Sequence, residues 1–260
     1  TERTKSVYDL LISLNDPDYQ REILFLSSDV IHPDCSTLFN KSMLTFKLGE
    51  PGVTLYQKHF PHLQPCAAFS GMNPLVGNIG VSLPINLGFK NIYLFGMDNG
   101  YRQKGHHHSK FSAYYNNNVK AEAFGEKAYG DSQRVCEGNF GGVVISNIMF
   151  DTSRRVTEEV LAANGDVQCF NCSDGAKIEM ARPLPSTEIH LSQSINKSAL
   201  IEEITGLGAP ITLSKQDLYP LLDIDFFNLF IDKMTDDWRC SFSSRNELNQ
   251  LMLRNFGYLA

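Results

Sequence analysis

The sequence has 260 residues, of which 42% are hydrophobic and 20% are charged; this supports a sizeable buried core and excludes an intrinsically disordered chain. Its 23 Lys and Arg against 29 Asp and Glu give a net charge of −6, which argues against a basic nucleic-acid binder. No apolar run approaches the roughly 20 residues that cross a bilayer, and the first residues lack a signal-peptide core. Six scattered cysteines are too few for a disulfide scaffold, so we expect a cytoplasmic protein without a membrane span.

Four apolar runs in the first two thirds of the chain predict β-strands, at residues 22–27, 43–46, 92–95 and 167–170. Helical spacing of apolar residues predicts helices at 7–14, 78–87 and 151–163, the last behind an Asp151/Thr152 cap. Strands that alternate with helices favour an α/β fold, with a Rossmann-like, mostly parallel sheet flanked by helices. We expect this sheet to run from about residue 20 to 180 in the order of a doubly wound fold.

After residue 186 the pattern becomes helical. Residues 200–204, 218–234 and 248–256 have helical spacing, and no comparable strand signal follows them. We therefore predict a Rossmann-like core domain over 1–185 and a helical C-terminal subdomain over 186–260. Pro183 and Pro185 would form a stiff junction between them.

Open α/β sheets bind ligands at the carboxyl ends of their strands, and the strand at 92–95 has the most informative end. It is followed by Gly96 and Asp98, then by His106-His107-His108 and Lys110. Adjacent histidine side chains diverge, which disfavours a zinc site. An imidazole that acts as a general base, or donates to a phosphate or sugar oxygen, fits better, and an ordinary solvated loop is the alternative.

Two more segments are expected beside this strand end. Gly77-Asn78 begins the preceding helix, where backbone N–H groups can hold an anion or small residues can simply pack closely. Ser173-Asp174-Gly175 follows the fourth strand and is either a plain turn or a turn that closes over a ligand. We expect Asp98, the histidine loop and this turn to share one rim, with Asp98 the most buried. We interpret Cys169 and Cys172 as unreactive thiols.

In this order, the motifs resemble the core domain of bacterial motility accessory factors (Maf proteins), over about residues 70–180. That domain is shared with archaeal hydroxymethylpterin diphosphokinases and is distantly similar to bacterial sialyltransferases that use CMP-activated sialic acid. The resemblance implies that Asp98, His106 and His108 are catalytic. It assigns nucleotide or substrate binding to Gly77, Asn78, Gly96, Tyr101, Lys110, Ser173, Asp174 and Gly175.

The chain departs from this family in two places. The family usually begins with an apolar strand and a glycine loop, whereas this chain begins with a predicted helix, so we expect its first glycine-loop strand to be absent. The sialyltransferases place a histidine base shortly before the helix that matches 151–163. Here residues 137–142 read Glu-Gly-Asn-Phe-Gly-Gly, so that mechanism is not carried over unchanged.

The leading hypothesis is a glycosyltransferase that moves a nonulosonic, sialic-acid-like sugar from a CMP donor to Ser or Thr of flagellin. Its partners would be the nucleotide sugar, as co-substrate, and flagellin, with no nucleic acid. Gly77 and Asn78 would hold the nucleotide phosphates, Asp98 or a loop histidine would be the base, and Lys110 or a protonated histidine would stabilise the leaving phosphate. One alternative is a pterin diphosphokinase in which Asp98 holds Mg²⁺ on ATP. Another is a noncatalytic flagellin chaperone or adaptor that uses an apolar patch on 186–260.

Overall fold

The computed structural model describes residues 2–14, 16–59, 66–102, 133–191, 194–210, 216 and 224–259. The chain forms two compact units, Thr1–Ala209 and Pro210–Ala260, which we describe separately. The domain boundary after residue 185 stays a prediction about which segments fold together.

The N-terminal part of the first unit contains a parallel sheet. It has the strands β1 (Leu24–Ser28), β2 (Lys41–Lys47) and β3 (Ala68–Phe69), in the order β1-β2-β3. Leu24 of β1 pairs with Lys41 of β2, and Phe46 of β2 pairs with Ala68 of β3. The helices of this part are α1 (Glu2–Ser13), α2 (Pro17–Arg21), the short η1 (Pro33–Leu38) and α3 (Pro51–His59).

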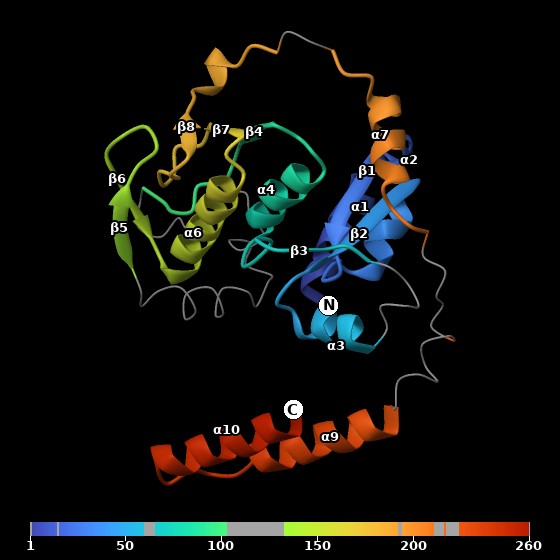
Figure 1. The fold of residues 1–260 in the computed structure, drawn as a ribbon, viewed down its shortest axis with the longest axis vertical. Helices are drawn as coiled ribbons and strands as arrows, with labels where there is room; N and C mark the ends of the chain where they lie inside the picture. The colour runs from blue at the N-terminus through green and yellow to red at the C-terminus, as the bar shows by residue number, and fades with distance from the viewer. Residues whose placement is uncertain are drawn as a thin grey trace. The chain divides into compact units, whose positions relative to one another are not determined.

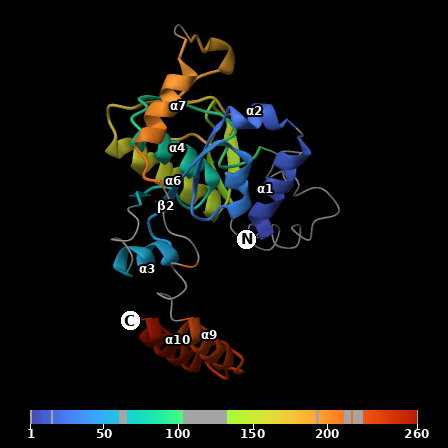
Figure 2. The same cartoon turned by 90° about the vertical axis from the view of Figure 1, so that its right-hand side faces the viewer.

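A second parallel sheet carries the strand ends that matter for function. Its strands are β4 (Asn91–Leu94), β7 (Gln168–Asn171) and β8 (Ala181–Pro183), in the order β4-β7-β8. Helices α4 (Val76–Asn86) and α6 (Ile148–Ala163) lie side by side (Figures 1 and 2). These two helices and the second sheet, with its loops, share one hydrophobic core. Its buried residues are Val81, Ile85, Ile92, Leu94, Met97, Leu161, Cys169, Ile178 and Ala181. Burial of this apolar surface is the main stabilising contribution.

An antiparallel hairpin of β5 (Arg134–Glu137) and β6 (Val143–Ser146) lies between β4 and α6 in the chain. Isolated bridges attach it to the second sheet's loops, Tyr101 to Ile145 and Gly138 to Ala176. The hairpin is therefore attached beside the ends of β4 and β7, and Val144 of β6 is fully buried there.

The rest of the described chain is helical. The first unit ends with η3 (Ser186–Glu188) and α7 (Lys197–Gly206). The second unit contains α9 (Ile224–Trp238) and α10 (Arg245–Leu259), joined by an ion pair of 3.0 Å between Arg254 and Asp237. In the described segments, no helix has both the length and the apolar character that crossing a membrane requires.

The α/β class is confirmed, because all four predicted strands form and pair in parallel with helices around them. The expectation of one continuous sheet is not met. Over the described residues the strands form two three-stranded sheets and a hairpin, since β3 is only two residues long and offers little backbone to bridge them. The predicted Asp151/Thr152 cap is also wrong: α6 begins earlier, where the Asn147 side chain accepts the N–H of Phe150 at 2.9 Å.

Candidate functional site

Strands β4 and β7 end at the same edge of the sheet, because their last residues, Leu94 and Asn171, pair with each other. The N–H of Cys172 donates to the Leu94 carbonyl at 2.9 Å, and the N–H of Ala176 donates to the Asp98 carbonyl at 2.7 Å. We call residues 96–98 and 173–175 together the strand-end rim. As predicted from strand-end geometry, Asp98 and the Ser173 turn lie on the same edge.

Gly175 permits this close approach. A Cβ at Gly175 would overlap the backbone of Asp98, so a larger residue cannot occupy the turn without displacing it. Ser173 lies inward, where its Oγ accepts the N–H of Met97 at 3.3 Å. Ser173 and Gly175 are buried whereas Asp98 is exposed. The expectation that Asp98 is the most buried is therefore wrong, because the turn folds beneath it.

The Asp98 carboxyl has a perturbed environment. Loss of water around it, and then the like charge of Asp174, raise the pKa of Asp98 above its ordinary value. The residue as a whole is still exposed, which limits the shift. A carboxylate that binds protons more readily than usual and faces solvent is suited to accept a proton from a bound hydroxyl.

Asp174, the second carboxylate of the rim, is paired. Arg102 forms a bidentate ion pair with the Asp174 carboxylate: its Nε lies 2.9 Å from Oδ2, and its Nη2 donates to Oδ1. The same Nη2 donates to the Gly141 carbonyl at 3.1 Å. Arg102 was not singled out from the sequence, yet it connects the β4 loop, the β7 turn and the tip of the β5–β6 hairpin. The role of Asp174 as a substrate ligand stays a prediction.

The start of α4 is packed against the rim. A Cβ at Gly77 would lie 3.3 Å from Cγ of Met97, the residue before Asp98. Asn78 is fully buried, and its amide is used inside the protein: Nδ2 donates to the Ser153 carbonyl at 2.8 Å and Oδ1 accepts from Ser153 Oγ at 2.9 Å. This side chain fastens α4 to α6, and the backbone N–H of Asn78 donates to the Leu75 carbonyl at 3.0 Å. The role of Asn78 in nucleotide binding stays a prediction.

Of the other predicted site residues, the structure describes Gly96 and Tyr101. Gly96 has a left-handed φ of 69° and open space around it. Tyr101 pairs with Ile145 through two backbone hydrogen bonds of 2.8 and 2.9 Å, and its hydroxyl accepts from Gln133 at 3.4 Å. His106, His108 and Lys110 lie outside the described residues, and their roles stay predictions.

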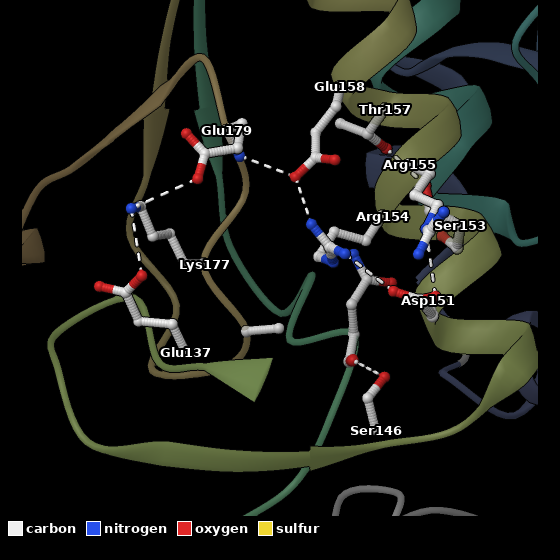
Figure 3. A network of polar contacts seen from close by, with 12 residues as sticks. Glu137, Ser146, Asp151, Ser153, Arg154, Arg155, Thr157, Glu158, Lys177 and Glu179 are labelled. Atoms are coloured by element: carbon white, nitrogen blue, oxygen red, sulfur yellow. Dashed lines mark hydrogen bonds and ion pairs between the residues drawn. The ribbon is translucent and has the colours of Figure 1, made fainter. Parts of the chain in front are cut away.

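A polar network braces the hairpin against α6 (Figure 3). Asp151 binds Arg134 of β5 at 2.7 Å, Arg154 at 2.8 Å and Arg155 at 3.1 Å. Arg154 also binds Glu158, which accepts the N–H of Glu179 at 2.8 Å. Burial alone would raise the pKa of Asp151, but the hydrogen bond from Arg154 and the three positive charges outweigh it and lower that pKa.

The thiols of the Cys169–Cys172 pair are free. Burial raises the pKa of Cys169 to about 12 and also raises that of Cys172. Both therefore stay protonated at neutral pH, which agrees with the interpretation as unreactive thiols. Across the described ranges, no group of three His, Cys, Asp or Glu side chains is placed to hold a metal ion.

No protein-family model matches the sequence, and the comparison with curated proteins finds no match. Among solved structures, the chain is similar to the MAf glycosyltransferase from Magnetospirillum magneticum AMB-1, with 26% sequence identity and a TM-score of 0.52. The chain has a Maf-like fold. The similarity covers 71% of this chain and 25% of that one, so it spans about a quarter of the length of the known structure. This supports the Maf resemblance; the links to diphosphokinases and sialyltransferases stay predictions.

Proposed function

We propose that this chain is the sugar-transferring part of a glycosyltransferase. It moves a nonulosonic, sialic-acid-like sugar from a CMP carrier to a Ser or Thr hydroxyl of flagellin, in the cytoplasm. The similarity to the MAf glycosyltransferase supports the reaction class. The observation that carries the proposal is Asp98, an exposed carboxyl of raised pKa at the carboxyl end of β4.

The reaction is a displacement at the sugar's anomeric carbon. The acceptor oxygen forms a bond to that carbon, the bond from the carbon to the phosphate oxygen breaks, and CMP leaves with the electron pair. Asp98 takes the proton of the acceptor hydroxyl. General-base assistance of this kind typically contributes about 100-fold to 10,000-fold to the rate.

The remaining roles follow from the rim. We assign the CMP phosphates to the backbone at Gly77, at the start of α4, where the helix dipole favours an anion. Asn78 would support this segment from within, because its own N–H is bonded to the Leu75 carbonyl. Gly96, Tyr101 and the 173–175 turn line the substrate. His106 or His108 and Lys110 would stabilise the charge on the leaving phosphate.

A ligand screen tests this function. We expect CMP and CMP-nonulosonates to raise the melting temperature of the chain, with or without Mg²⁺, and UDP-sugars to leave it unchanged. A shift with ATP that requires Mg²⁺ would instead favour the diphosphokinase. Flagellin binding that survives Asp98→Ala, together with no nucleotide binding, would favour the noncatalytic adaptor.

A further inference from the structure

The tip of the β5–β6 hairpin lies directly against the strand-end rim. It consists of Gly138-Asn139-Phe140-Gly141-Gly142, and Gly141 and Gly142 have left-handed φ values of 86° and 72°. The N–H of Asn139 donates to the Gly175 carbonyl at 2.8 Å. The tip is therefore anchored to the same turn that lies against Asp98.

Asn139 is only 5% exposed, and within the described part of the chain only the nitrogen of its side-chain amide is hydrogen-bonded. Nδ2 donates to the carbonyls of Asn171 and Ser173, both at 2.9 Å. These bonds fix the orientation of the amide, because a flip would place Oδ1 against two carbonyl oxygens. Oδ1 then faces away from the end of β7 and has no hydrogen-bond partner among the residues that the structure describes.

A buried acceptor without a partner is unusual, because folded proteins satisfy nearly all buried polar groups. The contrast with Asn171, the last residue of β7, is informative. Asn171 is fully buried and uses both ends of its amide, donating to the Ala176 carbonyl at 3.3 Å and accepting the Ser173 N–H at 3.1 Å. Asn139, like Asn171, is held in place by hydrogen bonds of its side-chain amide. In Asn139, however, the acceptor Oδ1 is not used by these bonds.

We propose that Asn139 is a substrate-positioning residue whose Oδ1 accepts a hydrogen bond from a sugar hydroxyl of the nucleotide-sugar donor. The inference rests on the proposed function. A carbonyl oxygen selects a hydroxyl or N–H donor and repels a phosphate oxygen, so Asn139 orients the sugar while the start of α4 takes the phosphates. Oδ1 of Asn139 is covered in this structure. The glycines of the tip allow its backbone to move, so that the sugar hydroxyl can reach this oxygen.

Two variants of the full chain separate this role from a structural one. Asn139→Ala and Asn139→Asp both lose Nδ2 and its two bonds, but only Asn139→Asp keeps an oxygen acceptor. Calorimetry with CMP-N-acetylneuraminate should show affinity falling about threefold to tenfold in Asn139→Ala, the usual range for one hydrogen bond. Asn139→Asp should retain more of the affinity, most clearly at mildly acidic pH, where the buried carboxyl is protonated and its O–H can donate to one of the two carbonyls while its other oxygen accepts.

Asn171→Ala is the matched control for loosening the turn. It should lower the melting temperature while changing the affinity less than Asn139→Ala does. Equal losses of affinity in Asn139→Ala and Asn139→Asp, or wild-type affinity in Asn139→Ala, would overturn the inference and leave the proposed function standing. Affinity that depends on Asn139 in a chain that transfers no sugar would support the inference and contradict the function. A wild-type chain that does not bind this donor would overturn both.

Discussion

The two carboxylates of the rim have opposite environments although they are neighbours. Asp174 is clamped by Arg102, whereas the described residues place no ion pair on Asp98. Burial and the charge of Asp174 instead raise the pKa of Asp98. One carboxylate is thereby fixed as part of the scaffold, and the other stays available for proton transfer.

The raised pKa of Asp98 predicts a pH-dependent effect of Asp98→Asn on stability. The folded chain binds this proton more tightly than the unfolded chain, so ionisation of Asp98 lowers stability as the pH rises above about 4. Asp98→Asn removes that cost and should melt at or above the wild-type temperature at pH 7. Thermal melts from pH 3.5 to 7 check this, and the difference should vanish at the acidic end. A variant that is less stable at pH 7 than at pH 4, relative to wild type, would argue against the shift.

Asp151 should behave in the opposite way. Its pKa is lowered, so its contribution to stability is present above the ordinary Asp pKa and is lost as the pH falls through the folded value. Asp151→Asn leaves three arginines without their shared partner and should cost about 2–3 kcal/mol at pH 7. Urea unfolding measures this. Asp166→Asn, which removes an exposed pair with Lys90, is the control and should change little.

At the level of elements, close backbone approach positions the rim. Gly175→Ala would press a Cβ into the Asp98 backbone and should destabilise the chain by about 2 kcal/mol or more. Gly80→Ala, in the middle of α4 with no atom within 4 Å of its Cβ position, should instead be neutral or stabilising by up to about 1 kcal/mol. Denaturant unfolding of both variants provides the comparison, and equal effects would show that the approach is not constrained.

The sequence predicted the elements that have their own local signal. Residues 92–95 and 167–170 are apolar runs, and the corresponding strands β4 and β7 form in parallel as expected. The β5–β6 hairpin was not predicted, because only one of its strands has such a signal. Val143, Val144 and Ile145 of β6 form an apolar run after Gly142 that could have indicated a strand, whereas three of the four residues of β5 are exposed. The hairpin is held by the Tyr101–Ile145 bridge and by Arg134 on Asp151, contacts between distant residues that no local pattern reports. The sequence placed Asp98 and the Ser173 turn together by strand-end geometry, but it did not reveal Arg102 or Asn139 for the same reason.

At the scale of the whole molecule, α7 belongs with the first sheet. Ile204 of α7 is 6% exposed, and a Cβ at Gly208 would lie 2.9 Å from Cε of Met43 in β2. A cavity of about 220 Å³ is lined by Lys41 of β2 together with Ser198 and Ile201 of α7. The helix therefore covers part of the sheet that a boundary after residue 185 would expose.

Two truncations test where the first unit ends. We expect the fragment 1–209 to unfold cooperatively with a melting temperature close to that of the corresponding transition in the full chain. The fragment 1–185 loses α7 and should melt lower, because the apolar surface under Ile204 becomes exposed. Circular dichroism melts of both fragments provide the measurement. Equal stability of the two would place the boundary after residue 185, as the sequence predicts.

We propose above that the strand-end rim transfers a sugar with Asp98 as the base. This proposal is tested most directly by the rate at which wild type and Asp98→Asn move the sugar from a CMP-nonulosonate to flagellin, with Asp166→Asn as the control for loss of a carboxylate elsewhere. We predict that Asp98→Asn stays folded and loses at least about 100-fold in rate, while Asp166→Asn transfers like the wild type. Transfer by a folded Asp98→Asn at the wild-type rate would show that Asp98 is not the base.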